Sequence, residues 1–251
     1  MNLPTISEDT ILNGRIRLLQ FRSGYRFSID AILLSAFIQP GTDETIVDMG
    51  TGCGIIPLIL TFRNPGVTVI GIEIQTELAE MAQKNVMLNE LENRIAIRCQ
   101  DLKTVNRQNL KSPVDRVVSN PPYRKINSGR INPADQEAVA RHELSTNLKD
   151  IIRTTTGLLN KGGRLDMIYS AERLTDVLTE MRFHGIEPKQ IRMVHSRMNT
   201  SSRLFLVSGV SGGNPGGIDV LPPLYIYEAN GRYSDDVSAM LSPVLRNDGL
   251  A

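Results

Sequence analysis

The sequence predicts a doubly wound α/β fold: one seven-stranded, mostly parallel sheet with an antiparallel edge, and a short N-terminal extension. Three observations support this prediction. Short apolar runs alternate with helical segments, a glycine-rich turn joins the first such strand to a helix, and acidic or amide side chains directly follow three strands. Strands that alternate with helices through right-handed crossovers form a parallel sheet with helices on both faces.

The elements follow from apolar runs and from the signals that end them. The seven expected strands are 45–47, 67–72, 95–98, 114–118, 163–169, 190–195 and 203–210. The expected helices are 55–62, 75–89, 133–159 and 171–184. The late pair of strands indicates the antiparallel edge, and the glycine-rich stretch 211–217 predicts a flexible loop and not a domain linker.

Composition agrees with a single compact unit. At 251 residues and 41% hydrophobic, the chain is long enough to bury one sizeable core. The two cysteines, Cys53 and Cys99, have no paired spacing, which argues against a disulfide framework or a zinc site and fits a reducing cytoplasm. We expect no signal peptide and no membrane span, because no apolar run is long enough.

The glycine turn is the stretch 48–54, Asp48-Met49-Gly50-Thr51-Gly52-Cys53-Gly54. Glycines permit positive φ and let backbone approach a ligand at the carboxyl ends of parallel strands. A dinucleotide fingerprint reads G-x-G-x-x-G and brings pyrophosphate to a helix N-terminus, whereas here the glycines alternate as G-x-G-x-G after an aspartate. The spacing therefore favours a ligand without pyrophosphate.

Acidic residues follow the second and third strands. Glu73 lies at about the separation from the glycine turn at which an acid meets ribose hydroxyls in such folds. Asp101 precedes Leu102 after the third strand, where its carboxylate could accept from an adenine amine beside a backbone N–H. Either acid alone would more often be a solvated strand end. Their order after Asp48 favours a binding role.

The fourth strand ends in Asn120-Pro121-Pro122-Tyr123. Proline fixes φ and pushes the preceding residue to an extended conformation, so this segment is a stiff bend. An asparagine carbonyl and a proline carbonyl can together accept both protons of an NH2 group, and the tyrosine offers a flat face for stacking. A simple proline turn is the common alternative. This string should occur by accident in roughly one chain in a thousand of this size.

From Asp48 to Tyr123 the chain resembles class I S-adenosylmethionine-dependent methyltransferases, a Rossmann-like fold, with the Asn-Pro-Pro-Tyr motif. Segments 12–14, 20–25, 27–34, 71–75, 140–144 and 222–224 are similar to the bacterial tRNA1(Val) (adenine-37-N6)-methyltransferase family. The resemblance implies S-adenosyl-L-methionine as cofactor, a substrate-side extension at 1–40 and a methyltransferase domain at 41–251. The implied cofactor-binding residues are Asp48, Gly50, Gly52 and Gly54 at the methionine end, Glu73 at the ribose, Asp101 and Leu102 at the adenine, and Asn120. The implied catalytic residues are Asn120, Pro121, Pro122 and Tyr123.

The resemblance implies methyl transfer to the N6 amine of adenine in tRNA, expected at position 37 of tRNA-Val. Three alternatives stay open: a protein glutamine N5-methyltransferase, a ribosomal RNA guanine-N2 methyltransferase, and a cofactor-binding RNA chaperone without turnover. Only about 45 residues precede the glycine turn, which is short for the N-terminal helical domain of glutamine methyltransferases. The intact motif 120–123 disfavours the chaperone.

The net charge of +1 alone predicts no nucleic-acid partner, but the basic residues are clustered. The clusters lie near Arg15, Arg22, Arg26, Arg124 and Lys125, and they predict a tRNA-binding face unless they are merely solvated surface. We expect a cytoplasmic monomer or weak dimer that binds no metal. His142 receives no catalytic role, because an attacking amine loses its proton readily once it is methylated. The stretch 124–135 receives none because it is harder to align with the family.

Overall fold

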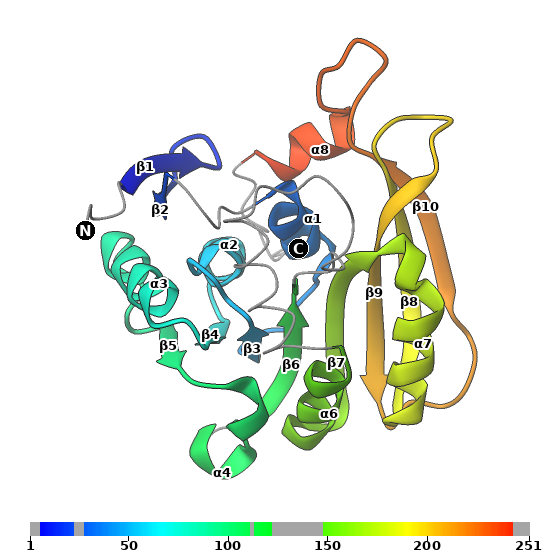
Figure 1. Ribbon diagram of the computed structural model, residues 1–251, viewed down its shortest axis with the longest axis horizontal. Helices are drawn as coiled ribbons and strands as arrows, with labels where there is room; N and C mark the ends of the chain where they lie inside the picture. Colours follow the sequence, from blue (N-terminus) through cyan, green and yellow to red (C-terminus); the bar gives the residue numbers. More distant parts are fainter. Residues whose placement is uncertain (1–5, 23–27, 111–112, 122–147, 243–251) are drawn as a thin grey trace, which may run out of the picture.

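The computed structural model describes residues 6–22, 28–110, 113–121 and 148–242. Its centre is an eight-stranded sheet in the order β10-β8-β9-β7-β6-β3-β4-β5 (Figure 1). The strands are β3 (Thr45–Met49), β4 (Thr68–Glu73), β5 (Ile95–Cys99), β6 (Val114–Ser119), β7 (Leu159–Ser170), β8 (Ile186–His195), β9 (Ser202–Ser211) and β10 (Asp219–Tyr225). Neighbours pair in parallel except β9, which is antiparallel to both β7 and β8. The predicted fold, with antiparallel pairing towards one end of the sheet, is confirmed.

The sheet has one strand more than the seven expected. The additional strand, β10, lies at the edge and pairs in parallel with β8, with an irregular register between Leu221 and Leu224. Pro222 and Pro223 fall inside this strand, and a sequence with two prolines gives little strand signal. An edge strand tolerates them because one row of its N–H groups has no neighbour to bond.

Two helical layers cover the sheet. The first consists of α1 (Ile29–Phe37), α2 (Ile55–Arg63), α3 (Thr76–Leu88) and α8 (Asp235–Met240). The second consists of η1 (Leu102–Thr104), α4 (Arg107–Leu110), α6 (Leu148–Leu158) and α7 (Leu174–Phe183), which follows the short η2 (Ala171–Arg173). Successive strand residues alternate between the two core clusters, as period-two side chains require: Ile46 faces the first and Val47 the second. Of the helix expected at 133–159, the part before residue 148 lies outside the described residues.

The N-terminal segment forms a hairpin that the sequence reading did not predict. Its strands are β1 (Ile6–Ile11) and β2 (Ile16–Phe21), joined by a turn in which Leu12, Asn13 and Gly14 all have positive φ. Leu12, Ile16 and Leu18 are buried in the first core cluster, and β2 lies beside α3 (Figure 1). The proposed boundary at residue 40 stays a prediction.

A buried ion-pair group fixes β6. The Arg116 guanidinium, 3% exposed, donates to Glu44 Oε2 at 2.7 Å, to the Asp166 carboxylate on β7 and to the Gln39 carbonyl at 3.0 Å. Burial alone would lower the pKa of Arg116, but the carboxylates of Asp166 and Glu44 outweigh it and raise that pKa. The strand that directly precedes Asn120 is therefore tied to β7 and to the connection between α1 and β3.

Candidate active site

The glycine turn is held against β4. The backbone N–H groups of Gly50 and Thr51 both donate to the Ile72 carbonyl, at 2.9 and 3.0 Å. Gly50, Gly52 and Gly54 have φ of 77°, 58° and 84°, so all three positions favour glycine. A Cβ at Gly50 would meet nothing within 4 Å, whereas one at Gly54 would lie 3.2 Å from the Cβ of Ala82 on α3. Gly50 thus borders open space, and Gly54 allows the turn to pack on a helix.

Asp48 is a buried acid that has no partner in the described part of the chain. Its side chain is 0% exposed, and neither its carboxylate oxygens nor the neighbouring Thr51 hydroxyl has a hydrogen-bond partner among the residues that the structure describes. Burial raises the pKa of the Asp48 carboxyl to about 7; the negative charge of Glu73 adds to the rise. The nearby Thr51 hydroxyl lowers the pKa of Asp48, although it does not reach hydrogen-bond geometry with the carboxylate. Buried polar atoms are normally satisfied, so this group has the chemistry of a site for a cationic or hydrogen-donating ligand.

Glu73, at the end of β4, is also buried but is held by backbone. Its Oε2 accepts from the Gly52 N–H at 2.9 Å, and its Oε1 accepts from the Gln75 N–H at 3.0 Å. Oε1 also accepts from the Gln75 side-chain amide at 3.5 Å, at the limit of hydrogen-bond distance, whereas Oε2 keeps its second lone pair for a ligand hydroxyl. The same side chain therefore orders the glycine turn and presents an acceptor to a ligand.

Asp101 follows β5 and is half-buried. Its Oδ1 accepts from the Lys103 N–H at 2.9 Å and caps η1, which leaves Oδ2 to accept from a ligand. Leu102 is buried in the second core cluster. Sequence reasoning did not anticipate the capping role of Asp101, which gives this residue a structural reason to be acidic as well.

The end of β6 lies beside the end of β3. The Ser119 hydroxyl donates to the Met49 carbonyl at 2.8 Å, and Val118 pairs with Asp48 across the two strands. Asn120 therefore lies two residues, or about 7 Å, beyond the level of Asp48. Asn120 is half-buried and Pro121 is buried.

Several predicted positions lie outside the described residues. These are Pro122, Tyr123, Arg26, Arg124 and Lys125, together with the stretch 124–135 and His142. The described cofactor-binding and catalytic positions gather at one edge of the sheet, at the carboxyl ends of the adjacent strands β6, β3, β4 and β5. Arg15 and Arg22 are exposed on the N-terminal hairpin.

Sequence reasoning missed Asn85, whose side chain is 0% exposed on α3. Its amide accepts from the Leu19 N–H at 2.6 Å and donates to the carbonyls of Leu19 and Cys53, at 3.0 and 2.9 Å. One turn later, Asn89 bonds both backbone groups of Arg17 in the same way, at 2.9 and 2.7 Å. The i, i+4 rise of a helix, about 6 Å, matches the spacing of alternate strand residues. The signal available in the sequence was a pair of asparagines four residues apart on an expected helix.

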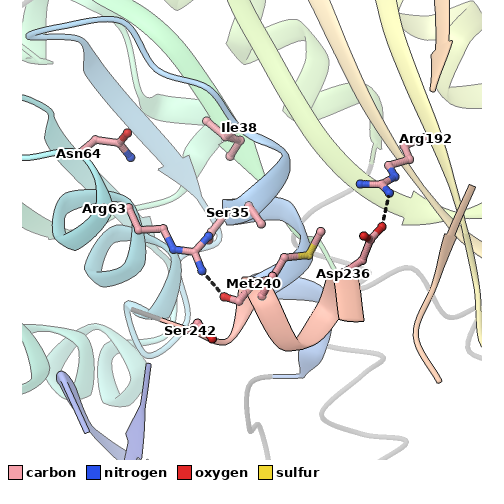
Figure 2. A pocket seen from close by; sticks show the side chains of 10 residues that line it. Ser35, Ile38, Arg63, Asn64, Arg192, Asp236, Met240 and Ser242 are labelled. Atoms are coloured by element: carbon pink, nitrogen blue, oxygen red, sulfur yellow. Dashed lines mark hydrogen bonds and ion pairs between the residues drawn. The ribbon is translucent and has the colours of Figure 1, made fainter. Parts of the chain in front are cut away.

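A cavity of about 450 Å³ lies elsewhere, between α1, α2, α8 and β8 (Figure 2). Arg63 donates to the Met240 carbonyl at this cavity, and Arg192 pairs with Asp236 at 2.8 Å. No predicted site residue lines it. Because its arginines are engaged by neighbouring groups and none of the predicted residues reaches it, we do not assign the chemistry to it.

The described residues contain no group of three or more His, Cys, Asp or Glu side chains arranged to hold a metal ion. Burial raises the pKa of the Cys53 thiol to about 12, so this side chain in the glycine turn stays neutral. Within the described ranges, every helix is too short or too polar to cross a bilayer.

A family profile described as the methyltransferase small domain matches residues 28–188, which include every described residue of the site. The chain belongs to this family. It is 27% identical to the tRNA1(Val) (adenine(37)-N6)-methyltransferase of Pedobacter heparinus, over 86% of this chain and 89% of the relative. The enzyme of the same name from Porphyromonas gingivalis is 35% identical over 61% of each chain.

Two solved structures show the same fold. A predicted O-methyltransferase from Agrobacterium tumefaciens has a TM-score of 0.67 at 20% identity, covering 87% of this chain and 99% of its own. TYW2 of M. jannaschii in complex with AdoMet has a TM-score of 0.55 at 16% identity, covering 84% and 87%. The predicted class I methyltransferase architecture is therefore confirmed.

Proposed function

We propose that this methyltransferase transfers a methyl group from S-adenosylmethionine to the N6 amine of adenine in tRNA. One observation carries the proposal: Asn120 and Pro121 follow β6, whose Val118 pairs with Asp48 on β3, a buried acid that has no hydrogen-bond partner among the described residues. This arrangement supports an amine-accepting bend close to an acid that suits a cationic ligand. The named relatives support adenine in tRNA as the substrate.

The residues present fit the cofactor. Asp48 and Thr51 hold buried oxygens that lack partners, and the Gly50 position has open space on its side-chain side. Asp48 would hold the cationic amino acid end, and Glu73 the ribose hydroxyls. Asp101 would accept from the adenine amine. When bound, S-adenosylmethionine supplies a methyl group on a positively charged sulfur.

The chain's own contribution to catalysis is positioning. The N6 lone pair is conjugated with the adenine ring, so the amine is a poor nucleophile. The Asn120 side-chain oxygen and the Pro121 carbonyl would accept its two protons, which favours a pyramidal nitrogen with its lone pair free. A base has to leave its stack to reach such a bend, and Tyr123 would stack on it. No general base is required, because the methylated amine loses a proton to water.

The same bend would accept the NH2 of a glutamine side chain or of guanine. The names of the relatives favour adenine in tRNA over both. Adenine-37 of tRNA-Val is the nucleotide we propose, on the names of the relatives. We also propose a cytoplasmic location, where the enzyme would meet a tRNA substrate.

The test is incubation with labelled S-adenosylmethionine and either unmodified bulk tRNA or total protein, followed by mass spectrometry of nucleosides. We expect label in N6-methyladenosine. Label in N2-methylguanosine, or in protein alone, would overturn the proposal. A matched reaction with the Asn120→Ala variant controls for contaminating activity.

A further inference from the structure

A second group of side chains lies outside the predicted site, at the end of β10 and on the loops that follow β8 and β10. We call it the tyrosine surface: Arg197, Tyr225, Tyr227, Arg232 and Tyr233. The rings of Tyr227 and Tyr233 stack, with centroids 5.3 Å apart and planes at 13°. The Arg197 guanidinium carbon lies 5.7 Å from the Tyr227 ring centroid. Tyr233 is nonetheless 42% exposed, and both arginines are exposed.

Backbone bonds order these loops in advance. The N–H groups of Ile226 and Tyr227 donate to the carbonyls of His195 and Ser196, both at 2.9 Å, and so continue the pairing of β10 with β8. The Thr200 hydroxyl donates to the Arg197 carbonyl at 2.6 Å and accepts from the Arg197 N–H at 3.2 Å. A surface that is already ordered loses little entropy when it binds a partner.

The tyrosine surface lies on the same edge of the sheet as the candidate active site. Because β8 and β10 run parallel to β6, their carboxyl ends lie at the same edge of the sheet. They are three and four strand spacings from β6, or about 14 and 19 Å. Figure 1 shows the two loops, yellow and orange, on the opposite side of this edge from the N-terminal hairpin. A ligand larger than a nucleotide could touch both the surface and the site.

The charges favour an anion. The side chains of Arg197, Arg203 and Arg232 form no ion pair within the part of the chain that the structure describes. Of the nearby acids Glu228, Asp235 and Asp236, the last is paired with Arg192 at 2.8 Å. An exposed ring beside guanidinium groups that form no ion pair among the described residues matches unpaired nucleotides, whose bases stack on aromatic faces while their phosphates contact arginines.

We propose that the tyrosine surface binds unpaired nucleotides of the RNA substrate that flank the methylated base. The identity of that RNA as tRNA rests on the proposed function. Tyr233 supplies a stacking face, and Arg197 contacts a phosphate. This surface and the basic hairpin would then hold the RNA from two sides of the active edge.

The experiment measures binding of unmodified tRNA and of a labelled single-stranded oligoribonucleotide by fluorescence anisotropy over a range of salt. Tyr233→Ala should weaken binding about five- to a hundredfold, and Tyr233→Phe should keep most of it. Arg197→Ala should reduce the salt slope by about 0.7 to 0.9, the loss of one phosphate contact. Melting temperature and cofactor affinity should stay at wild-type values in both variants.

Matched controls lie at the opposite edge of the sheet, where Phe183 is 80% exposed and Arg182 forms only a surface ion pair. Phe183→Ala and Arg182→Ala should bind RNA as the wild type does. Equal losses in these controls, or wild-type affinity in both Tyr233→Ala and Arg197→Ala, would overturn the proposal. Loss of RNA affinity in the tyrosine-surface variants alone would support this proposal. That result would stand even if the wild-type enzyme leaves tRNA adenine unmethylated, because the missing methylation would refute only the proposed function.

Discussion

Replacing Asp48 with asparagine tests the interpretation of the glycine turn most directly. The change keeps the size of the side chain and removes the charge whose burial raises the pKa to about 7 from an ordinary value of 3.8. In the folded protein this carboxyl has no hydrogen-bond partner, whereas in the unfolded chain water solvates it. Ionising Asp48 therefore costs folding free energy that a neutral asparagine side chain at the same position would not cost.

The sign follows from proton binding. Between pH 4 and pH 7 the folded state binds more protons at Asp48 than the unfolded state, so the free energy of unfolding falls as pH rises through this window. Above about pH 7 the ionisation of Asp48 no longer changes the free energy of unfolding. A rise in pKa from 3.8 to about 7 corresponds to a total on the order of 4 kcal/mol. Between pH 5 and 7.5 the expected loss is about 2 to 3 kcal/mol.

The assay is urea unfolding of the wild type and of Asp48→Asn at pH 5 and pH 7.5. The wild type should lose about 2 to 3 kcal/mol more than the variant over this interval. Cofactor affinity should move the opposite way, rising with pH in the wild type because a cationic ligand favours the charged carboxylate, and changing little in the variant. Equal pH dependence of unfolding in the two proteins, within about 0.5 kcal/mol, would refute the reasoning.

Three further predictions concern other parts of the molecule. Glu73→Ala should weaken S-adenosylmethionine binding by about 1.5 to 3 kcal/mol in calorimetry, through loss of hydrogen bonds to a charged group, and unchanged affinity would remove Glu73 from the site. Asn120→Ala should slow single-turnover methylation of tRNA by about a hundredfold to a thousandfold with cofactor affinity nearly unchanged; a wild-type rate would contradict the amine-accepting bend. Asp166→Ala should lower the free energy of unfolding by about 3 kcal/mol, because it leaves the buried Arg116 with Glu44 as its sole carboxylate partner among the described residues. A smaller decrease in the free energy of unfolding, measured by denaturation, would show that water reaches Arg116 in the variant.

The sequence predicted seven of the eight strands of the main sheet because each contains an apolar run, and the central strand β3 is buried on both faces, as Ile46 and Val47 show. It predicted the order of the site because strand ends in a parallel sheet meet at one edge. It did not predict the N-terminal hairpin, whose pairing depends on contacts with α3 that lie 66 residues away in sequence. The cap made by Asp101 and the missing partners of Asp48 are three-dimensional facts that composition and spacing do not contain.

The amide of Asn85 bonds two segments that lie 34 residues apart, Leu19 on the hairpin and Cys53 in the glycine turn. Displacing β2 from α3 would leave buried backbone N–H and C=O groups without hydrogen-bond partners. The hairpin and α3 should therefore open as one cooperative unit, and the glycine turn should open with them. Amide hydrogen exchange should accordingly give Leu19 and Gly54 similar protection, although their sequence neighbourhoods differ. Under the proposed function, an RNA that binds the hairpin and a cofactor that binds the turn would each strengthen the binding of the other by the same factor.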